Sequence, residues 1–190
     1  IQGIGALDVD VRSTGIDFFT AGTYKWLLGG YGVAPFYVRE ELLERIGPDR
    51  LGSLSIAEEL DHHRFRVHDD ARKYGYATMG FGSVFQLRAA LDYLLRVGVA
   101  NIEAHTVGLA QQLNAGLVGQ GHDVWTPKDN RSPIVTFRHH RDITLVQSTL
   151  EEAGIRISYK AEGEELRAGI ALFNNSDDID KLLDVTGNWA

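Results

Sequence analysis

A single lysine stands between two apolar stretches near the start of the sequence. Lys25 lies in the segment TYKWLLGGYG, which separates IDFFTAG from VAPFYV. A lysine amine attacks a carbonyl carbon only in its neutral form, so a nucleophilic lysine needs apolar surroundings or a nearby cation to lower a pKa that is ordinarily about 10.4. The flanks therefore allow two interpretations: a surface loop lysine that lies over Trp26, or an amine that forms a Schiff base.

The glycines around Lys25 raise the alternative of a nucleotide-binding loop. Glycine lets a backbone approach a bulky cofactor closely. Residues 3–5 (GIG) and 30–32 (GYG) each match the start of G-x-G-x-x-G, but neither has the third glycine and neither begins a long helix. The pattern G-x-x-x-x-G-K-[ST] does not occur. The motifs therefore disfavour a nucleotide fold.

A metal site is the second alternative, because two stretches are rich in histidine and aspartate. The candidate ligands are Asp61, His62, His63, His68, Asp69, Asp70, His139 and His140. Adjacent histidines point in different directions in strands and in helices, so such a pair rarely chelates one ion. The sequence has neither H-E-x-x-H nor cysteine. We interpret these residues as solvated charge and expect no metal.

Composition excludes several functional classes. The 190 residues, 44% hydrophobic and 24% charged, suit one ordinary globular domain or two small ones. A net charge of −7 argues against a nucleic-acid-binding protein. No charged-then-apolar leader or long apolar run predicts secretion or a membrane span, so a cytoplasmic location is expected.

Periodicity predicts the elements that must position Lys25 and its neighbours. Residues 15–20 and 33–38 read as short strands on either side of the lysine segment, with Pro35 favouring an edge, and residues 40–46 suit a short helix. Further along, a small α/β layer is expected, with helices at 83–98, 100–118, 142–153 and 176–186 and strands at 134–137, 154–159 and 166–173. Ser176 is the expected N-cap of the last helix.

Three segments resemble the class V aminotransferase family of fold-type-I enzymes, which use pyridoxal 5′-phosphate (PLP). They are IQGIGALDVDVRSTGIDFFTAGTYKWLLGGYGVAPFYVR, ARKYGYATMGFGSVFQLRAALDYLLRVGVANIEAH and ELRAGIALFNNSDDIDKLLDVT, in family order. Members of this family include cysteine desulfurases, isopenicillin N epimerases and kynureninases. The resemblance implies an α/β fold, with residues 1–82 forming the C-terminal part of the PLP-binding large domain and its sheet, and residues 83–190 forming a small C-terminal α/β domain.

The resemblance also implies residue roles. Lys25 would form the aldimine with PLP and later move the proton at the α-carbon of an amino acid. Gln2 matches the glutamine that hydrogen-bonds the phenolic oxygen of PLP. Tyr24, a histidine in many members, would donate to the phosphate, and Thr78 would reach the phosphate of the other subunit's cofactor in a homodimer. Arg167 would grip the substrate α-carboxylate, which suits its planar fork of donors. Thr23 is a weaker candidate for the phosphate.

Several family features have no counterpart in the sequence. The aspartate on the pyridine nitrogen would precede Ile1, and the phosphate-binding turn and stacking ring also lie upstream. We therefore interpret the chain as the C-terminal half of a longer enzyme. We expect the chain to bind PLP poorly without the missing N-terminal half. Loop 160–164 lacks the cysteine of desulfurases, so a desulfurase acting through its own thiol is not expected. Transamination, elimination at a C–S or C–Se bond, epimerisation, or an inactive dimerisation module remain open.

Overall fold

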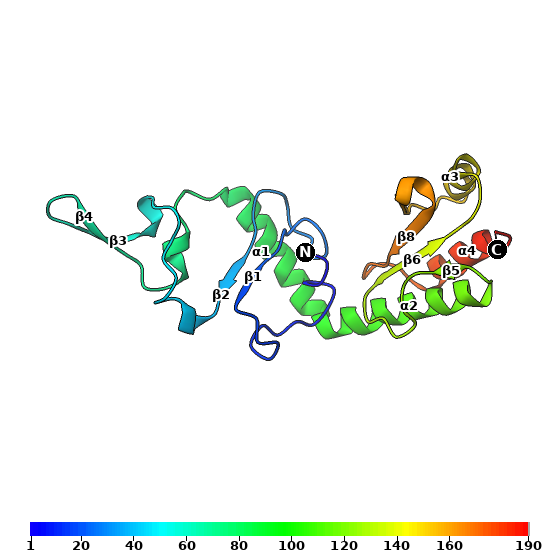
Figure 1. Ribbon diagram of the computed structural model, residues 1–190, viewed down its shortest axis with the longest axis horizontal. Coiled ribbons are helices and arrows are strands. Elements are labelled where there is room, and N and C mark those ends of the chain that lie inside the picture. Colours follow the sequence, from blue (N-terminus) through cyan, green and yellow to red (C-terminus); the bar gives the residue numbers. More distant parts are fainter. Residues whose placement is uncertain (190) are drawn as a thin grey trace. The chain divides into compact units, whose positions relative to one another are not determined.

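The computed structural model describes residues 1–189, which form two compact units. The N-terminal unit contains Ile1–Gly5 and Val9–Arg96, and the C-terminal unit contains Ala6–Asp8 and the chain from Val97 onward. Figure 1 shows the elements of each unit in chain order. The family domain boundary expected between residues 82 and 83 stays a prediction.

Two short strands frame the lysine segment. β1 (Phe18–Thr20) and β2 (Phe36–Val38) pair antiparallel. Both lie inside the predicted strands but have only three residues each, and Pro35, which lacks a backbone donor, directly precedes β2. The short helix expected at 40–46 is reduced to a 3-10 turn at Glu40–Leu42.

Residues 56–67, for which the sequence predicted no strand, form a β-hairpin. β3 (Ile56–Leu60) and β4 (Arg64–Val67) pair antiparallel, and the turn between them holds His62 and His63 at φ values of 60° and 59°. Most of its side chains are exposed on both faces. Since neither face is buried, no alternation of apolar and polar residues marks the strands. Two 3-10 turns, Ser53–Ser55 and Ala71–Tyr74, flank the hairpin.

Helix α1 (Phe81–Val97) completes the N-terminal unit and confirms the helix expected at 83–98. Its inner side buries Leu94, and its first turn is tied to the lysine segment because the Ser83 hydroxyl donates to the Tyr31 carbonyl at 2.9 Å. Gly98 follows the helix with φ 88°, a conformation that glycine adopts without strain, so the predicted end is correct.

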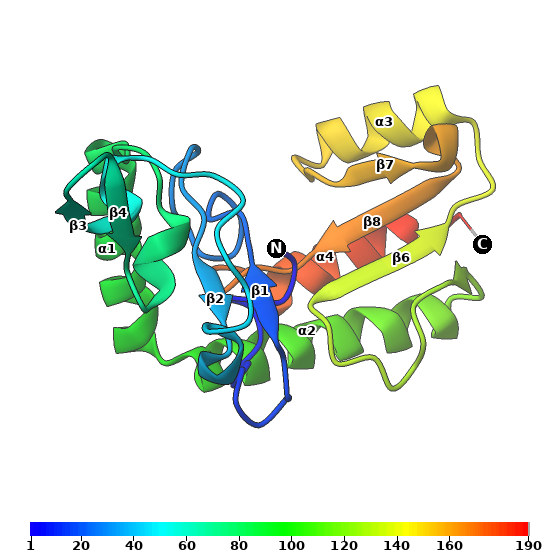
Figure 2. The same cartoon turned by 60° about the vertical axis from the view of Figure 1, so that its left-hand side comes forward.

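The C-terminal unit is a four-stranded antiparallel sheet in the order β5-β6-β8-β7. Its strands are β5 (Asp123–Val124), β6 (Ile134–Arg138), β7 (Ser158–Lys160) and β8 (Glu165–Gly169), and its helices are α2 (Val99–Gly119), α3 (Ile143–Glu152) and α4 (Ser176–Thr186). Figure 2 shows α4 lying across the sheet behind β6 and β8, and α2 packs against both α4 and β6. Apart from the short β5, these elements confirm the predicted α/β layer, although the strand expected at 154–159 begins only at Ser158 and the strand expected at 166–173 ends at Gly169.

Alternation along β6 and β8 separates the core from the other face of the sheet. Val135 and Phe137 on β6 and Leu166 and Ala168 on β8 join the buried cluster under the helices. Their neighbours in sequence, Arg167 among them, point to the opposite face.

The N-cap of helix α4 lies one residue before the expected Ser176. Its N-cap is Asn175, whose side chain accepts a hydrogen bond from the Asp178 backbone, while Asp178 bonds back to the Asn175 N–H. The expectation of Ser176 is therefore wrong, because this reciprocal pair needs the cap three residues before Asp178. Among the helices of residues 1–189, none has the length and apolar character to cross a membrane.

Candidate functional site

The lysine segment is held closed by a buried threonine. Thr23 is 0% exposed, and its hydroxyl lies 2.8 Å from the Gly30 carbonyl and 3.0 Å from that of Val33. Its own carbonyl accepts from Gly29 N at 2.8 Å. These bonds use the hydroxyl that was considered for the phosphate, so Thr23 fixes the loop rather than a ligand.

The backbone around Lys25 is tightly turned. Leu28 N donates to the Lys25 carbonyl at 2.9 Å, and Leu28 has φ 55°, a left-handed conformation that is strained for a residue with a Cβ. Such strained residues cluster at functional sites, where the surrounding structure imposes them. The loop therefore presents Lys25 on a fixed rather than a flexible backbone.

Residues 1–5 lie directly against this loop. A Cβ on Gly5, which has φ 85°, would come within 2.6 Å of the Trp26 carbonyl oxygen. The Trp26 indole N–H donates to Gln2 Oε1 at 2.8 Å. The structure thus brings Gln2 beside Trp26, the residue that follows Lys25, although the two are 24 positions apart in sequence. The sequence did not predict this hydrogen bond between Trp26 and Gln2.

Lys25 differs from every other lysine of the chain. It is half-buried, and within residues 1–189 no hydrogen bond or ion pair engages its amine. Lys73 is more deeply buried, at 6% exposed, but donates to the Leu43 carbonyl. The remaining lysines are exposed: Lys128, Lys160 and Lys181.

Tyr24 and Thr78 both present free hydroxyl groups. Tyr24 is exposed and stacks on Tyr31, with ring centroids 4.6 Å apart and planes inclined by 20°. Thr78 is exposed in the irregular stretch before α1. In the described part of the chain, neither hydroxyl makes a hydrogen bond. The structure shows no contact that joins Thr78 to the lysine loop.

Arg167 belongs to the C-terminal unit, on the central strand β8. It pairs in register with Thr136 on β6 and Ser158 on β7, on the face away from the core. Among residues 1–189, no hydrogen bond or ion pair engages its half-buried guanidinium. Its neighbour Arg138 instead lies over the Trp125 ring at 4.9 Å. Arg167 is therefore an arginine on a sheet face with its donors free.

The histidine-rich stretches form no metal cluster in the part of the chain that the structure describes. His139 is buried at the end of β6, where its ring nitrogens contact the Gly163 carbonyl and the Arg141 N–H. In the other stretch, the Arg72 side chain hydrogen-bonds Asp70 and lowers the pKa of that carboxyl to about 2. In both stretches these side chains bind nearby groups of the protein itself.

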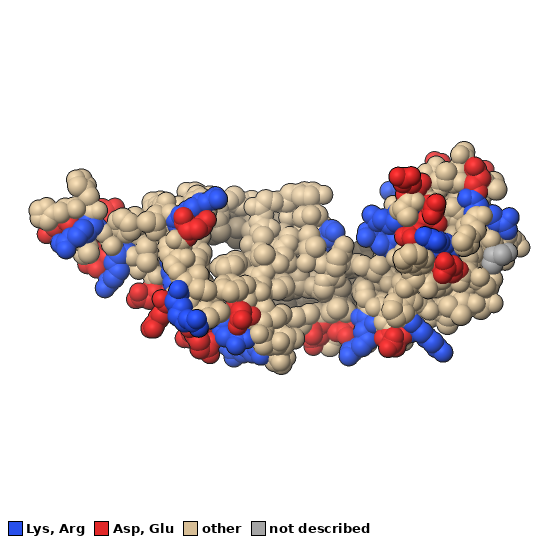
Figure 3. Space-filling view, viewed as in Figure 1, with Lys and Arg blue, Asp and Glu red and all other residues tan. Residues whose placement is uncertain are grey.

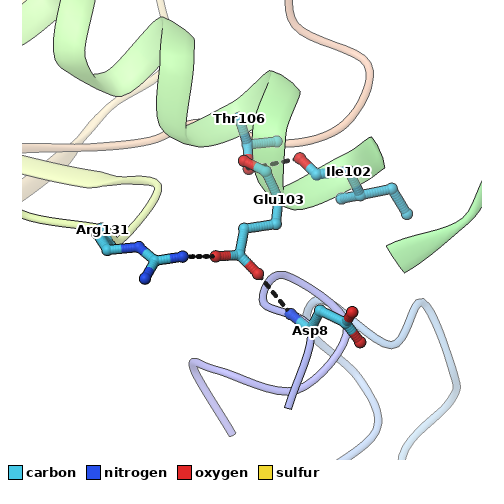
Figure 4. Close-up of polar contacts among 5 residues, drawn as sticks. All are labelled: Asp8, Ile102, Glu103, Thr106 and Arg131. Carbon is cyan, nitrogen blue, oxygen red and sulfur yellow. Dashed lines mark hydrogen bonds and ion pairs between the residues drawn. The ribbon is translucent and has the colours of Figure 1, made fainter. Parts of the chain in front are cut away.

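A second polar cluster lies in the C-terminal unit around Glu103 on α2. Figure 4 shows its carboxylate between two donors: the Asp8 N–H at 2.7 Å and the Arg131 guanidinium at 3.0 Å. Each oxygen therefore has a partner. The cluster ties residues 6–8 and the loop before β6 to α2, and it adjoins a cavity of about 500 Å³ that is lined mainly by residues of α2.

The strand order and helix placement define an α/β protein, and comparison with known proteins identifies its family. The profile of the family described as "Aminotransferase class-V" matches residues 1–182. The chain belongs to this family of PLP-dependent enzymes, which confirms the family and the α/β fold expected from the sequence.

The relatives by sequence are enzymes of this family. The chain is 25% identical to a probable cysteine desulfurase of Methanothermobacter thermautotrophicus, over 95% of this chain and 49% of that protein. It is 36% identical to the uncharacterized aminotransferase YcbU of Bacillus subtilis, over 55% of this chain and 27% of that one.

Solved structures show the same fold. The apo cysteine desulfurase of Thermococcus onnurineus matches with a TM-score of 0.85 and 20% identity, over 98% of this chain and 50% of that one. A cystine C–S lyase solved with its product cysteine persulfide matches with a TM-score of 0.84 and 22% identity, over 100% and 51%. A mutant of that lyase was solved with glycine covalently linked to its PLP cofactor. The chain thus spans about half the length of these relatives.

Proposed function

We propose that this chain supplies the lysine-bearing half of a PLP-dependent enzyme that acts on an amino acid. The observation that carries the proposal is the state of Lys25: a half-buried amine, without a partner in residues 1–189, on a loop closed by Thr23. A lysine free of ion pairs and partly removed from water is suited to act as a nucleophile.

The groups around Lys25 fit the chemistry of PLP. The cofactor offers an aldehyde, a phenolic oxygen and a phosphate, which need an amine and hydrogen-bond donors. Gln2 has an amide nitrogen free to donate, because its oxygen accepts from Trp26. Tyr24 and Thr78 carry hydroxyls that suit a phosphate. We propose that Lys25, Gln2 and Tyr24 hold the cofactor of their own subunit, and that Thr78 binds the phosphate of the neighbouring subunit's cofactor.

The chain's own residues then have separable tasks. When bound, PLP withdraws electrons from the α-carbon of the amino acid. Arg167 binds the α-carboxylate through two parallel N–H groups, which fixes the orientation of the substrate. The Lys25 amine would accept the proton from the α-carbon and return it.

Three reactions can follow this proton transfer. Transamination is the first candidate, and elimination at a C–S or C–Se bond and epimerisation are the others. Several relatives are named as cysteine desulfurases, but this chain contains no cysteine, so no thiol of the chain can carry sulfur. Elimination from a sulfur-containing substrate needs no protein thiol. For that reason C–S bond elimination is the second candidate activity, after transamination.

An exposed aromatic surface supports a partner for the N-terminal unit. Tyr31, Phe81 and Phe85, which we call the aromatic face, are 77%, 60% and 66% exposed, and Phe81 and Phe85 are one helical turn apart on α1. On the face shown in Figure 3, few charged side chains lie over α1. Exposed apolar groupings commonly mark interfaces. We propose that the N-terminal half of the enzyme covers this face, and that the complete enzyme is a cytoplasmic homodimer in which Thr78 serves the neighbouring site.

The test is PLP binding by the chain alone and by the chain combined with an N-terminal half. We expect a visible absorbance band only in the combination, and we expect Lys25→Ala to abolish it. Lys128→Ala, which removes an exposed lysine, is the control and should retain the band. If no band forms in the combination, the chain is instead an interaction or dimerisation module.

A further inference from the structure

We propose that Trp26 is a positioning residue for the cofactor: its indole N–H fixes the side-chain amide of Gln2 so that the amide nitrogen is the group left to bind the phenolic oxygen of PLP. This inference rests on the proposed function. It assigns a task to a residue whose role no motif indicates, because Trp26 and Gln2 meet only in the folded loop.

The chemistry of the two side chains sets the direction of the bond. An indole nitrogen is a donor only, whereas a glutamine amide has an oxygen acceptor on one side and two N–H donors on the other. The atom that lies 2.8 Å from the Trp26 nitrogen must therefore be the Gln2 oxygen. The opposite side of the amide then carries donors alone. A deprotonated phenol is an acceptor, so it can pair with this side and not with the other.

The loop backbone fixes Trp26 itself. Gly5 packs against the Trp26 carbonyl so closely that an added Cβ would lie within 2.6 Å of it. The turn from Lys25 to Leu28 holds the peptide on the other side. One short turn thus fixes the position of the Lys25 backbone and, through Trp26, the orientation of the Gln2 amide. Without the indole, the amide of Gln2 can rotate and present its oxygen, which would repel the phenolate.

The experiment measures PLP affinity for Trp26→Phe in the complete enzyme. Phenylalanine keeps an aromatic ring but removes the donor, and we expect PLP to bind about three- to tenfold more weakly, as for one lost hydrogen bond. In a Gln2→Met background, the same change should have less than a twofold effect, because the group on which Trp26 acts is gone. Trp125→Phe, in the other unit, is the matched control and should leave affinity unchanged.

Nuclear magnetic resonance of the 190-residue chain without cofactor gives a second readout. The side-chain amide of Gln2 should be as ordered as the backbone in the wild type and mobile in Trp26→Phe. Equal mobility in both proteins would overturn the inference, and so would an unchanged PLP affinity in Trp26→Phe or an equal loss in the Gln2→Met background. If the wild type binds no PLP at Lys25, the proposed function fails, and the amide mobility still decides the role of Trp26.

Discussion

At the scale of the residue, the proposed function depends on two cationic side chains. Lys25 is an amine with no partner among residues 1–189, and Arg167 is a guanidinium with free donors on the open face of a sheet. Other cations of the described residues do have partners, as Arg131 has in Glu103. Each of these two partly buried cations, taken within its own unit, is the residue-level support for the role proposed for it.

Arg167→Lys tests the carboxylate role. Lysine keeps the positive charge but loses the planar pair of donors, so we expect an amino-acid substrate to bind about tenfold more weakly while PLP affinity stays unchanged. The measurement is the substrate dissociation constant of the complete enzyme. Arg131→Lys, which alters an exposed arginine of the same unit, is the control. Unchanged substrate binding in Arg167→Lys would remove this residue from the site.

At the scale of the element, the lysine loop depends on one buried hydroxyl. Thr23→Val keeps the shape of the side chain but leaves the Gly30 and Val33 carbonyls without this donor. We expect a loss of about 1–3 kcal/mol in the free energy of unfolding, measured in urea. Thr14→Val removes an exposed hydroxyl bonded to the Asp10 carbonyl and should cost less than about 0.5 kcal/mol. Equal losses in the two variants would contradict the role of Thr23.

The cap of α4 predicts that the stability of the fold depends on pH. Hydrogen bonds from the Asn174 side chain and the Asn175 backbone lower the pKa of Asp178. A lowered pKa in the folded state adds stability above the ordinary carboxyl pKa of about 3.9, and this stability is lost as the pH falls through the folded value. Asp178→Asn should therefore be less stable than the wild type at pH 7 and should lose less stability in acid.

The measurement is urea unfolding at pH 7 and at about pH 3, with Asp177→Asn on the same helical turn as the control. The control should follow the wild type at both pH values. If Asp178→Asn loses as much stability in acid as the wild type, the carboxylate does not act through this cap.

Elements with one buried side were predictable from the sequence, and contacts across the chain were not. The strand expected at 134–137 and the helices α2, α3 and α4 follow from apolar spacing, since each buries one face in the core. Helix α1 was expected from the same spacing, although Leu94 is its only buried residue. The hairpin β3–β4 buries neither face and left no pattern. For the site, Lys25 and Gln2 came from family resemblance, whereas the Trp26–Gln2 bond needed the fold because it joins segments that only the loop brings together.

At the scale of the whole molecule, the central proposal is that the chain works with polypeptide beyond itself. It spans about half the length of its relatives, and the aromatic face of the N-terminal unit is exposed. Closed homodimers commonly share sites across their axis. If Thr78 serves the neighbouring site, two defective subunits can complete one site between them.

Mixing Lys25→Ala with Thr78→Val tests this sharing in the complete enzyme. The mixed dimer would hold one site with both an intact Lys25 and an intact Thr78, so about a quarter of all sites should regain wild-type PLP affinity after subunit exchange. Binding at limiting PLP measures the recovery. Absence of recovery, or a fully active monomer in gel filtration, would contradict the shared site.

The most direct test of the role proposed for Lys25 is chemical trapping of the cofactor on the chain. The complete enzyme is incubated with PLP, reduced with borohydride, digested and mapped by mass spectrometry. We expect the phosphopyridoxyl group on Lys25 and not on the other four lysines, one of which, Lys73, is already bonded to the Leu43 carbonyl. A group found on another lysine, or on none, would contradict the assignment of Lys25.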